Sequence, residues 1–258
     1  MFFRDRVQNV KPGEKVLEIG PGGTPHERAD VFLDLDPKLF KDETEAHYQR
    51  GAAPKLKTDK PIVYYDGKKF PFKDKEFDYV ICSHVLEHVD DIAAFVKEIF
   101  RITNKGYFEF PSILYDYIYD IPVHPNFVRF DKETNTLRWL KKADTHFAEF
   151  KDVQYFFFKS IEKGHECLVQ SLELSMIQGF EWTKPFTVKK ATSISQLVPP
   201  INKIQKARQL APLIPPAPAE RPVDQIPLEV LTSELKRRAK RRARRHAGRV
   251  ARKLGVRK

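Results

Sequence analysis

Cysteine is scarce in this sequence, because 258 residues contain only Cys82, within an apolar run, and Cys167, far from it. Two such residues form neither a disulfide framework nor a Cys-x-x-Cys metal site. Long apolar stretches are also lacking: no window approaches the roughly 18 apolar residues of a membrane span, and the N-terminus has no signal-type hydrophobic core. We therefore expect a cytoplasmic protein, attached at most peripherally to the inner face of the membrane.

Acidic residues are lacking at the C-terminus, where the net charge of +11 is concentrated. Residues 232–258 hold 13 of the 46 Lys and Arg residues but one of the 35 Asp and Glu residues, which leaves 33 basic and 34 acidic residues elsewhere. In this tail, small apolar residues recur every three or four positions opposite an Arg/Lys face, which is typical of a helix on an anionic membrane. Nucleic-acid phosphates would bind the same charge, and a solvated, partly disordered tail is the third interpretation.

Short β-branched or aromatic runs bounded by Gly, Pro or Asp predict five buried strands, at residues 16–20, 31–35, 61–65, 77–82 and 106–110. Residues 90–103 predict an amphipathic helix behind an Asp cap. This alternation predicts an α/β fold, with a Rossmann-like, doubly wound and mostly parallel sheet covered on both faces. Only seven residues, 24–30, precede the second strand after the glycines. The first crossover helix should therefore be reduced to about one turn, or absent.

The sequence after Pro111 indicates a different organisation. It predicts a Tyr- and Pro-rich lid or wall at 112–127, a hairpin at 127–142 with its turn near Glu133–Asn135, helices at 146–158 and 165–176, and a strand at 186–191. Eight prolines between residues 197 and 227 indicate a polyproline spacer. We therefore expect a main domain at 1–195 with a lid and hairpin insertion at about 112–142, a Pro-rich linker at 196–230 and a basic amphipathic tail at 231–258.

Carboxylates and glycines gather where the first three predicted strands end. These residues are Glu18, Gly20, Gly22 and Gly23 after the first strand, Asp34 and Asp36 after the second, and Asp66 and Gly67 after the third. Open α/β sheets bind ligands at this edge, and glycine lets a ligand approach the backbone closely. Glu18 would repel a pyrophosphate but suits a cation. Asp34, as the first residue to leave its strand, can accept hydrogen bonds from ribose hydroxyls, and Asp66 can accept one from an amine such as that of adenine.

Three stretches in this order, VLEIGPGG, VFLDLDP and YYDGKKFPFKDKEFDYVICSHVLEHVDD, resemble the class I S-adenosylmethionine-dependent methyltransferases, particularly their small type-11 branch. The resemblance covers about residues 10–111 and implies S-adenosylmethionine as the cofactor. It places Glu18, Gly20 and Gly22 at the methionine end, Asp34 at the ribose, and Asp66 and Gly67 at the adenine. Ser83 and His84 would stand near the transferable methyl group. The shortened first crossover departs from the family pattern, which leaves the contacts of residues 23–28 open.

Two histidines, His124 and His84, are the candidates for catalysis. His124 lies in the segment expected to roof the acceptor pocket, where a neutral imidazole could remove a hydroxyl proton; ordering a Pro-rich turn is the alternative. His84 either touches cofactor or substrate or is structural. His84 and His88 are four residues apart, but no third ligand is spaced to complete a site, so we expect no metal. Glu87 and His88 are instead expected to fix the loop after the fourth strand by hydrogen bonds.

The resemblance implies methyl transfer, and we expect an in-line reaction at an oxygen of a sugar, glycan or lipid-linked small molecule. The nearly neutral main domain and its aromatic insertion motivate this acceptor class, with the tail binding an anionic membrane surface or nucleic acid and no transmembrane segment. An RNA methyltransferase that collects RNA through the tail is the alternative. Against it, CSHVLEH stands where an Asn-Pro-Pro-Tyr-like motif would be expected. A non-enzymatic S-adenosylmethionine-binding scaffold is the third hypothesis, which the intact acidic strand ends oppose.

Overall fold

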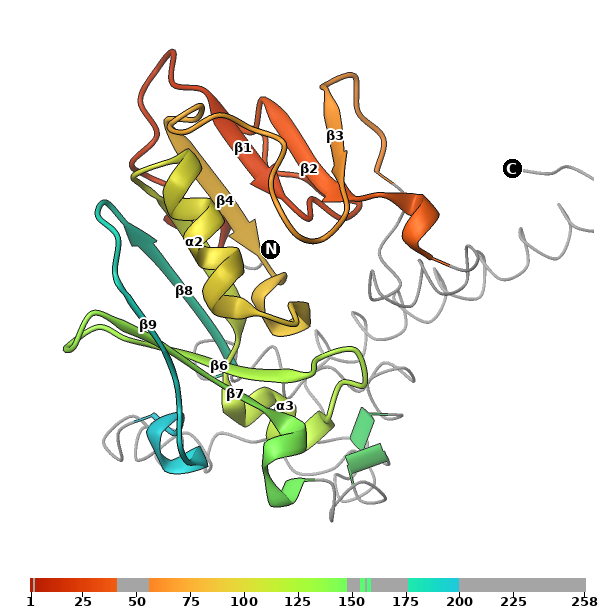
Figure 1. The fold of residues 1–258 in the computed structure, drawn as a ribbon, viewed down its shortest axis with the longest axis vertical. Coiled ribbons are helices and arrows are strands. Elements are labelled where there is room, and N and C mark those ends of the chain that lie inside the picture. The colour runs from red at the N-terminus through yellow and green to blue at the C-terminus, as the bar shows by residue number, and fades with distance from the viewer. Residues whose placement is uncertain (2, 41–55, 148–153, 156, 159–175, 200–258) are drawn as a thin grey trace, which may run out of the picture. The chain divides into compact units, whose positions relative to one another are not determined.

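The computed structural model describes residues 1, 3–40, 56–147, 154–155, 157–158 and 176–199 (Figure 1). Six strands of this part form a sheet in the order β3-β2-β1-β4-β5-β8. The parallel strands are β1 (Val16–Ile19), β2 (Val31–Leu35), β3 (Ile62–Tyr65), β4 (Tyr79–Ser83) and β5 (Gly106–Pro111). The fold is thus the expected Rossmann-like α/β sheet. All five predicted strands are present, but β3, at the edge of the sheet, is only partly buried and not buried as predicted.

The edge of the sheet beyond β5 was not predicted. There β8 (Ile177–Trp182) pairs with β5 in antiparallel orientation. The Pro-rich linker beyond residue 199, the basic tail, and nearly all of the helix predicted at 165–176 lie outside the described residues, as does part of the helix predicted at 146–158. The boundaries proposed for the three parts of the chain therefore stay predictions.

The connection from β1 to β2 contains no helix, as its length predicts, and residues 20–30 form a loop instead. The side chain of Arg4 fixes this loop. Its guanidinium donates hydrogen bonds to the carbonyl oxygens of Thr24 (3.1 Å) and Pro25 (2.7 Å) and pairs with Glu27 (2.7 Å). The N-terminal segment thus holds in place the loop that follows the glycines.

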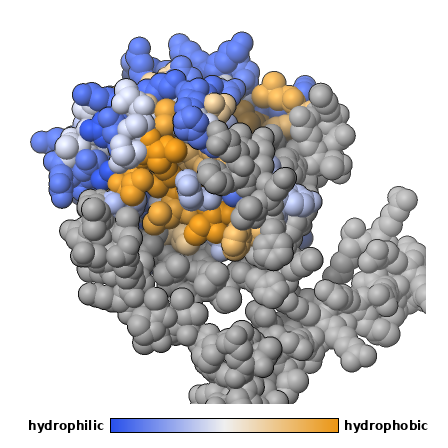
Figure 2. Space-filling model, turned by 90° about the horizontal axis from the view of Figure 1, so that it is seen from below, coloured by the Kyte–Doolittle hydropathy of each residue, from blue (hydrophilic) through white to orange (hydrophobic). Residues whose placement is uncertain are grey.

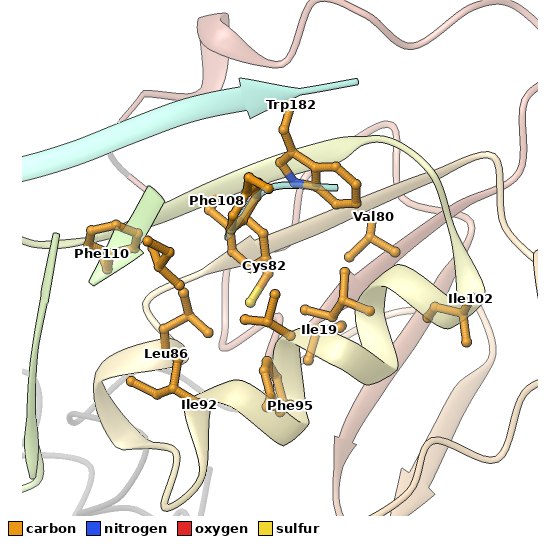
Figure 3. Packing of buried hydrophobic residues seen from close by; sticks show 14 of the residues in the cluster. Ile19, Val80, Cys82, Leu86, Ile92, Phe95, Ile102, Phe108, Phe110 and Trp182 are labelled. Carbon is orange, nitrogen blue, oxygen red and sulfur yellow. The ribbon is translucent and has the colours of Figure 1, made fainter. Parts of the chain in front are cut away.

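The two faces of the sheet are covered by different elements. Helix α2 (Ile92–Ile102), which begins behind the cap Asp91, packs on one face. Figure 3 shows Phe95 of this helix below Cys82 and Ile19 of the sheet. Because side chains alternate along a strand, the neighbouring residues point to the other face, where they pack against the N-terminal segment; they are Val16, Tyr79, Ile81 and Tyr107, packed against Met1, Val7 and Val10. In the described residues, irregular chain thus covers a face for which helices were expected.

The chain after β5 forms a short helix and a second sheet. Helix α3 (Ile113–Tyr119) lies within the predicted lid and is followed by the predicted hairpin, β6 (Asn126–Asp131) and β7 (Thr136–Lys141). The late strand β9 (Thr187–Lys190) pairs in parallel with β7, which gives the order β6-β7-β9. Phe130 of β6 stacks on Phe180 of β8 with ring centroids 3.6 Å apart. Aromatic packing therefore joins the two sheets.

The molecule exposes apolar surface on one side. Figure 2 views the side toward which the arrows of β1, β2 and β4 point in Figure 1, and hydrophobic residues gather in a band near its centre. Among the described residues, no helix is long and apolar enough to span a bilayer. Hydrophobic residues are thus exposed on the side of the molecule toward which these strands point.

Candidate active site

The turn after β1 consists of closely packed, bare backbone. Gly20 and Gly22 have φ of +63° and +56°, a left-handed conformation that favours glycine. A Cβ on Gly20 would lie 2.6 Å from Cγ2 of Val85, in the loop after β4. The amide of Gly20 also donates to the carbonyl of Leu33 in β2 (2.9 Å). The turn is therefore fixed against both strands that neighbour β1.

We expect Gly20→Ala to lower the free energy of unfolding by about 2–4 kcal/mol, because it adds left-handed strain and overlap with Val85. Gly13→Ala is the matched control, since Gly13 has φ +81° and no neighbouring atom lies within 4 Å of the position that a Cβ would take there. The loss of stability in Gly13→Ala should therefore come from the left-handed strain alone. Urea denaturation measures both variants, and Val85→Ala should recover part of the Gly20→Ala loss. Equal losses in the two glycine variants would contradict the overlap.

Glu18 is buried beneath this turn. Its side chain is 3% exposed, and its Oε2 accepts a hydrogen bond from the amide of His26 at 2.7 Å. Burial raises the pKa of Glu18 to about 7, although the hydrogen bond from His26 acts in the opposite direction. A carboxyl group in this state gains from a nearby cation. A nearby cation would lower this pKa and stabilise the carboxylate. The assignment of Glu18 to the positively charged end of a ligand stays a prediction.

The position of Asp34 in the structure differs from the position on which its choice as ribose ligand was based. It lies within β2, in register with Tyr64 of β3, and not beyond the end of the strand. Asp36 follows the strand, where its Oδ1 accepts the amide of Lys38 (2.9 Å) and caps a short 3-10 turn. The prediction that Asp34 is the first residue beyond β2 is therefore wrong. Its assignment to the ribose stays a prediction.

Asp66 and Gly67 follow β3 directly and are exposed. Oδ1 of Asp66 accepts the amide of Lys68 at 3.0 Å, and Gly67 has φ +82°. Since β1, β2 and β3 are neighbours in the parallel sheet, Glu18, Asp34 and Asp66 lie at the same edge. The three predicted carboxylates are at different levels along these strands: Glu18 is level with Phe32 and Ile62, and Asp34 with Tyr64, two residues before Asp66.

A buried carboxylate that was not predicted as a site residue organises the end of β4. Glu109 of β5 is 0% exposed and lies opposite Ser83 in the parallel pair. It accepts hydrogen bonds from the hydroxyls of Ser83 (2.9 Å) and Tyr107 (2.7 Å) and from the amide of Phe3 (2.9 Å). The hydroxyl of Ser83, which was predicted to contact the cofactor, therefore donates a hydrogen bond to Glu109. A charged residue inside the apolar run GYFEF was the available signal.

His84 lies between two buried carboxylates. Its Nδ1 is 3.1 Å from Oε1 of Glu87 and its Nε2 is 3.2 Å from Oε1 of Glu109. Burial alone would lower the pKa of His84, but the interactions with Glu109 and Glu87 raise it to about 9. The imidazole is therefore protonated at neutral pH, and its left-handed backbone, at φ +56°, is a strained conformation for a non-glycine residue. A role of His84 beside the methyl group stays a prediction, and this geometry favours a cation over a base.

His124 packs against His88, with ring centroids 4.7 Å apart. Its Nδ1 lies 3.0 Å from Oδ1 of the buried Asp116, which also pairs with Lys142 (3.0 Å). The Nδ1 of His88 lies 2.8 Å from the carbonyl oxygen of Val123, and burial lowers the pKa of His88. A carboxylate behind the imidazole is the arrangement that orients a catalytic histidine. The role of His124 as a general base stays a prediction.

Comparison with known proteins matches residues 29–109 to the methyltransferase domain family of type 11. Demethylmenaquinone methyltransferase from Corynebacterium efficiens is 30% identical over 103 residues, which cover 40% of this chain and 42% of the relative. The protein of the same name from Streptomyces griseus subsp. griseus is 27% identical over 105 residues, covering 38% and 41%. The match therefore spans about two fifths of the length of these curated relatives.

Solved structures are similar over part of the chain. The YcgJ protein of Bacillus subtilis is 16% identical with a TM-score of 0.32, covering 45% of this chain and 56% of that one. A possible histamine N-methyltransferase from Thermotoga maritima is 20% identical with a TM-score of 0.29, covering 43% and 49%. The segment matched by the family model contains Asp34, Asp66 and the loop after β4. The similarity to the methyltransferase domain of type 11 therefore covers residues 29–109, which include two of the three predicted carboxylates.

Proposed function

We propose that this protein transfers the methyl group of S-adenosylmethionine to an oxygen of a sugar, glycan or lipid-linked small molecule. The observation that supports the proposal most is that Glu18, Asp34 and Asp66 lie in or directly after three neighbouring parallel strands, toward the carboxyl ends of these strands. In this proposal Glu18 faces the cationic methionine end, Asp34 accepts hydrogen bonds from the ribose hydroxyls, and Asp66 accepts one from the adenine amine. The sulfonium is a strong electrophile, so the protein accelerates transfer mainly by holding acceptor, methyl carbon and sulfur in line.

The acceptor class is supported by surface and charge. The apolar band in Figure 2 lies on the side of the strand tips, where an acceptor would approach. The relatives are named for demethylmenaquinone, a lipid quinone. The main part of the chain, with 33 basic and 34 acidic residues, lacks the positive excess that a nucleic-acid groove requires. These observations favour a neutral acceptor with an apolar part over RNA.

Cofactor binding is expected to release a proton from Glu18 below pH 7. The pKa of this carboxyl group in the free protein is about 7, above its ordinary value, and a bound cation lowers it. Between those two pKa values the free protein holds a proton that the complex lacks, so affinity rises with pH up to about 7 and then levels off. Affinity at pH 6 should be about tenfold weaker than at pH 8.

Isothermal titration calorimetry with S-adenosylmethionine, in buffers of different ionisation enthalpy, measures this proton release. Glu18→Gln is the matched control, because it keeps the shape of the side chain but does not titrate. The variant should lose the part of the pH dependence that belongs to Glu18. An identical proton release in the variant and the wild type would remove Glu18 from the methionine end.

The acceptor class can be tested by transfer of a labelled methyl group from S-adenosylmethionine to separate lipid, glycan and RNA fractions of a cell extract. We expect label in the lipid or glycan fraction, with release of the label by ether-cleaving but not by peptide-cleaving chemistry. Replacing the Lys and Arg residues of 236–245 by Gln tests whether the tail contributes. Label confined to RNA, and lost in the Gln variant, would establish the RNA methyltransferase alternative.

A further inference from the structure

Three potential metal ligands from separate parts of the sequence meet beside the end of β4. Glu87 and His88 lie in the 3-10 turn Leu86–His88, and His124 lies in the turn after α3. Each offers one ligand atom, and these atoms all lie within 4.8 Å of one another. This cluster, Glu87, His88 and His124, is hereafter the Glu-His-His cluster. Because 36 residues separate the two histidines, no local spacing in the sequence reveals it.

The two imidazoles are already oriented as metal ligands. The carbonyl oxygen of Val123 can only accept a hydrogen bond, so Nδ1 of His88 (2.8 Å away) carries the proton and Nε2 carries a lone pair. Nδ1 of His124 faces the carboxylate of Asp116 at 3.0 Å, which assigns the same tautomer. A carbonyl or carboxylate behind the distal ring nitrogen is the usual outer partner of a metal-binding histidine. In the described part of the chain, no hydrogen bond occupies Nε2 of either ring.

The carboxylate of the cluster has an unsatisfied oxygen. Glu87 is 0% exposed, and its Oε1 is engaged by Nδ1 of His84 at 3.1 Å. Its Oε2 is buried without a hydrogen-bond partner among the described residues. An unpaired buried carboxylate oxygen costs free energy that a ligand at this position would recover. The oxygen is thus an independent indication that the cluster takes a cationic or hydrogen-donating ligand.

We propose that Glu87, His88 and His124 bind a divalent transition metal ion of the zinc class. Two imidazoles and one carboxylate form a three-ligand set found at catalytic zinc sites, in which further positions stay open. Zinc bonds of about 2.0–2.2 Å place tetrahedral ligands about 3.4 Å apart, so ligand atoms that lie within 4.8 Å of one another must approach by up to about 1.4 Å. Metal binding here does not depend on the proposed methyl transfer. It replaces the prediction of a general base at His124, because a metal-bound Nε2 has no lone pair for a proton.

The test uses the full-length chain, stripped with a chelator and titrated with zinc and, separately, with cobalt(II), whose visible absorption bands report nitrogen and oxygen coordination. We expect one equivalent to bind and the melting temperature to rise. His88→Gln and His124→Gln keep a hydrogen-bond donor but should weaken zinc binding at least 100-fold. Asp116→Asn, which alters the partner of His124 and also removes a charge paired with Lys142, should weaken it about 10- to 100-fold. His146→Gln, at an exposed histidine, is the control and should bind like the wild type.

Circular dichroism of each metal-free variant shows whether it is folded, and the mild Asp116→Asn change covers the case in which a histidine variant is not. Absence of the cobalt bands in the folded wild type would overturn the proposal. So would equal zinc affinity in the wild type and in folded His88→Gln and His124→Gln. Magnesium added in place of zinc should neither shift the melting temperature nor compete, because it prefers oxygen ligands.

Discussion

Glu109→Ala is expected to lower the free energy of unfolding by about 3–5 kcal/mol. Glu109 is fully buried and accepts hydrogen bonds from Ser83, Tyr107 and the amide of Phe3. Its removal leaves three buried hydrogen-bond donors unpaired. The protonated His84 also loses one of the two carboxylates with which it forms ion pairs. Removing one partner of a buried ion pair typically costs this much, because the other charge stays buried. The cost therefore arises mainly from the groups that are left behind.

Urea denaturation followed by circular dichroism measures this loss. Glu109→Gln should show an intermediate loss, since it keeps an acceptor oxygen but not the charge. Glu133→Ala, at an exposed position in the turn of the β6–β7 hairpin, should change stability by less than about 0.5 kcal/mol. A loss below about 1 kcal/mol for Glu109→Ala would show that these donors find other partners.

Asp34→Ala is expected to weaken the binding of S-adenosylhomocysteine by about 100-fold or more. Two hydrogen bonds from ribose hydroxyls to a carboxylate are each worth about 1.5–3 kcal/mol, and 1.4 kcal/mol corresponds to a factor of ten. The demethylated product serves as the ligand because it keeps the adenosine but has no methyl group to transfer. Calorimetry measures the affinity directly.

Asp36→Ala is the matched control for this experiment. Asp36 lies two residues further along, and its carboxylate is engaged by the amide of Lys38. Its loss should change affinity by no more than a few-fold. If Asp36→Ala abolished binding while Asp34→Ala bound normally, the ribose would belong to the residue after β2 and not to the one within it.

The fold was predictable where strands are buried on both faces. Such strands are continuous apolar runs, and β1, β4 and β5 were found because of this. The less buried β2 and β3 were found from their β-branched and aromatic residues. The strand β8 was missed although Ile177–Trp182 largely alternates between apolar and polar residues, because the segment before it resembles a helix. Its partner β5 lies about 70 residues earlier in the sequence. A pairing over this distance depends on tertiary packing, which a local pattern does not report.

The candidate site was predictable only in part. The carboxylates of β1 to β3 lie on neighbouring strands toward the same edge, because parallel strands end at one edge of the sheet. By contrast, Glu109 becomes a central acceptor only when β5 lies beside Ser83 and the N-terminus packs on the same face. The meeting of His88 and His124 depends on where the chain turns after α3. In both cases the sequence shows the residue type but not its neighbours.

The way the N-terminal segment is attached has a consequence for biosynthesis. The amide of Phe3 bonds to Glu109, and the amide of Gln8 bonds to Glu181, 173 residues later (2.8 Å). At translation rates of about 5–20 residues per second, roughly 10–35 s pass between the synthesis of Gln8 and that of Glu181. During that time Gln8 lacks its partner in β8, whereas Val16 of β1 can already pack against Tyr79, Ile81 and Tyr107. In the nascent protein, the N-terminal segment can therefore be attached at Gln8 only after β8, the last strand of the main sheet, has been synthesised.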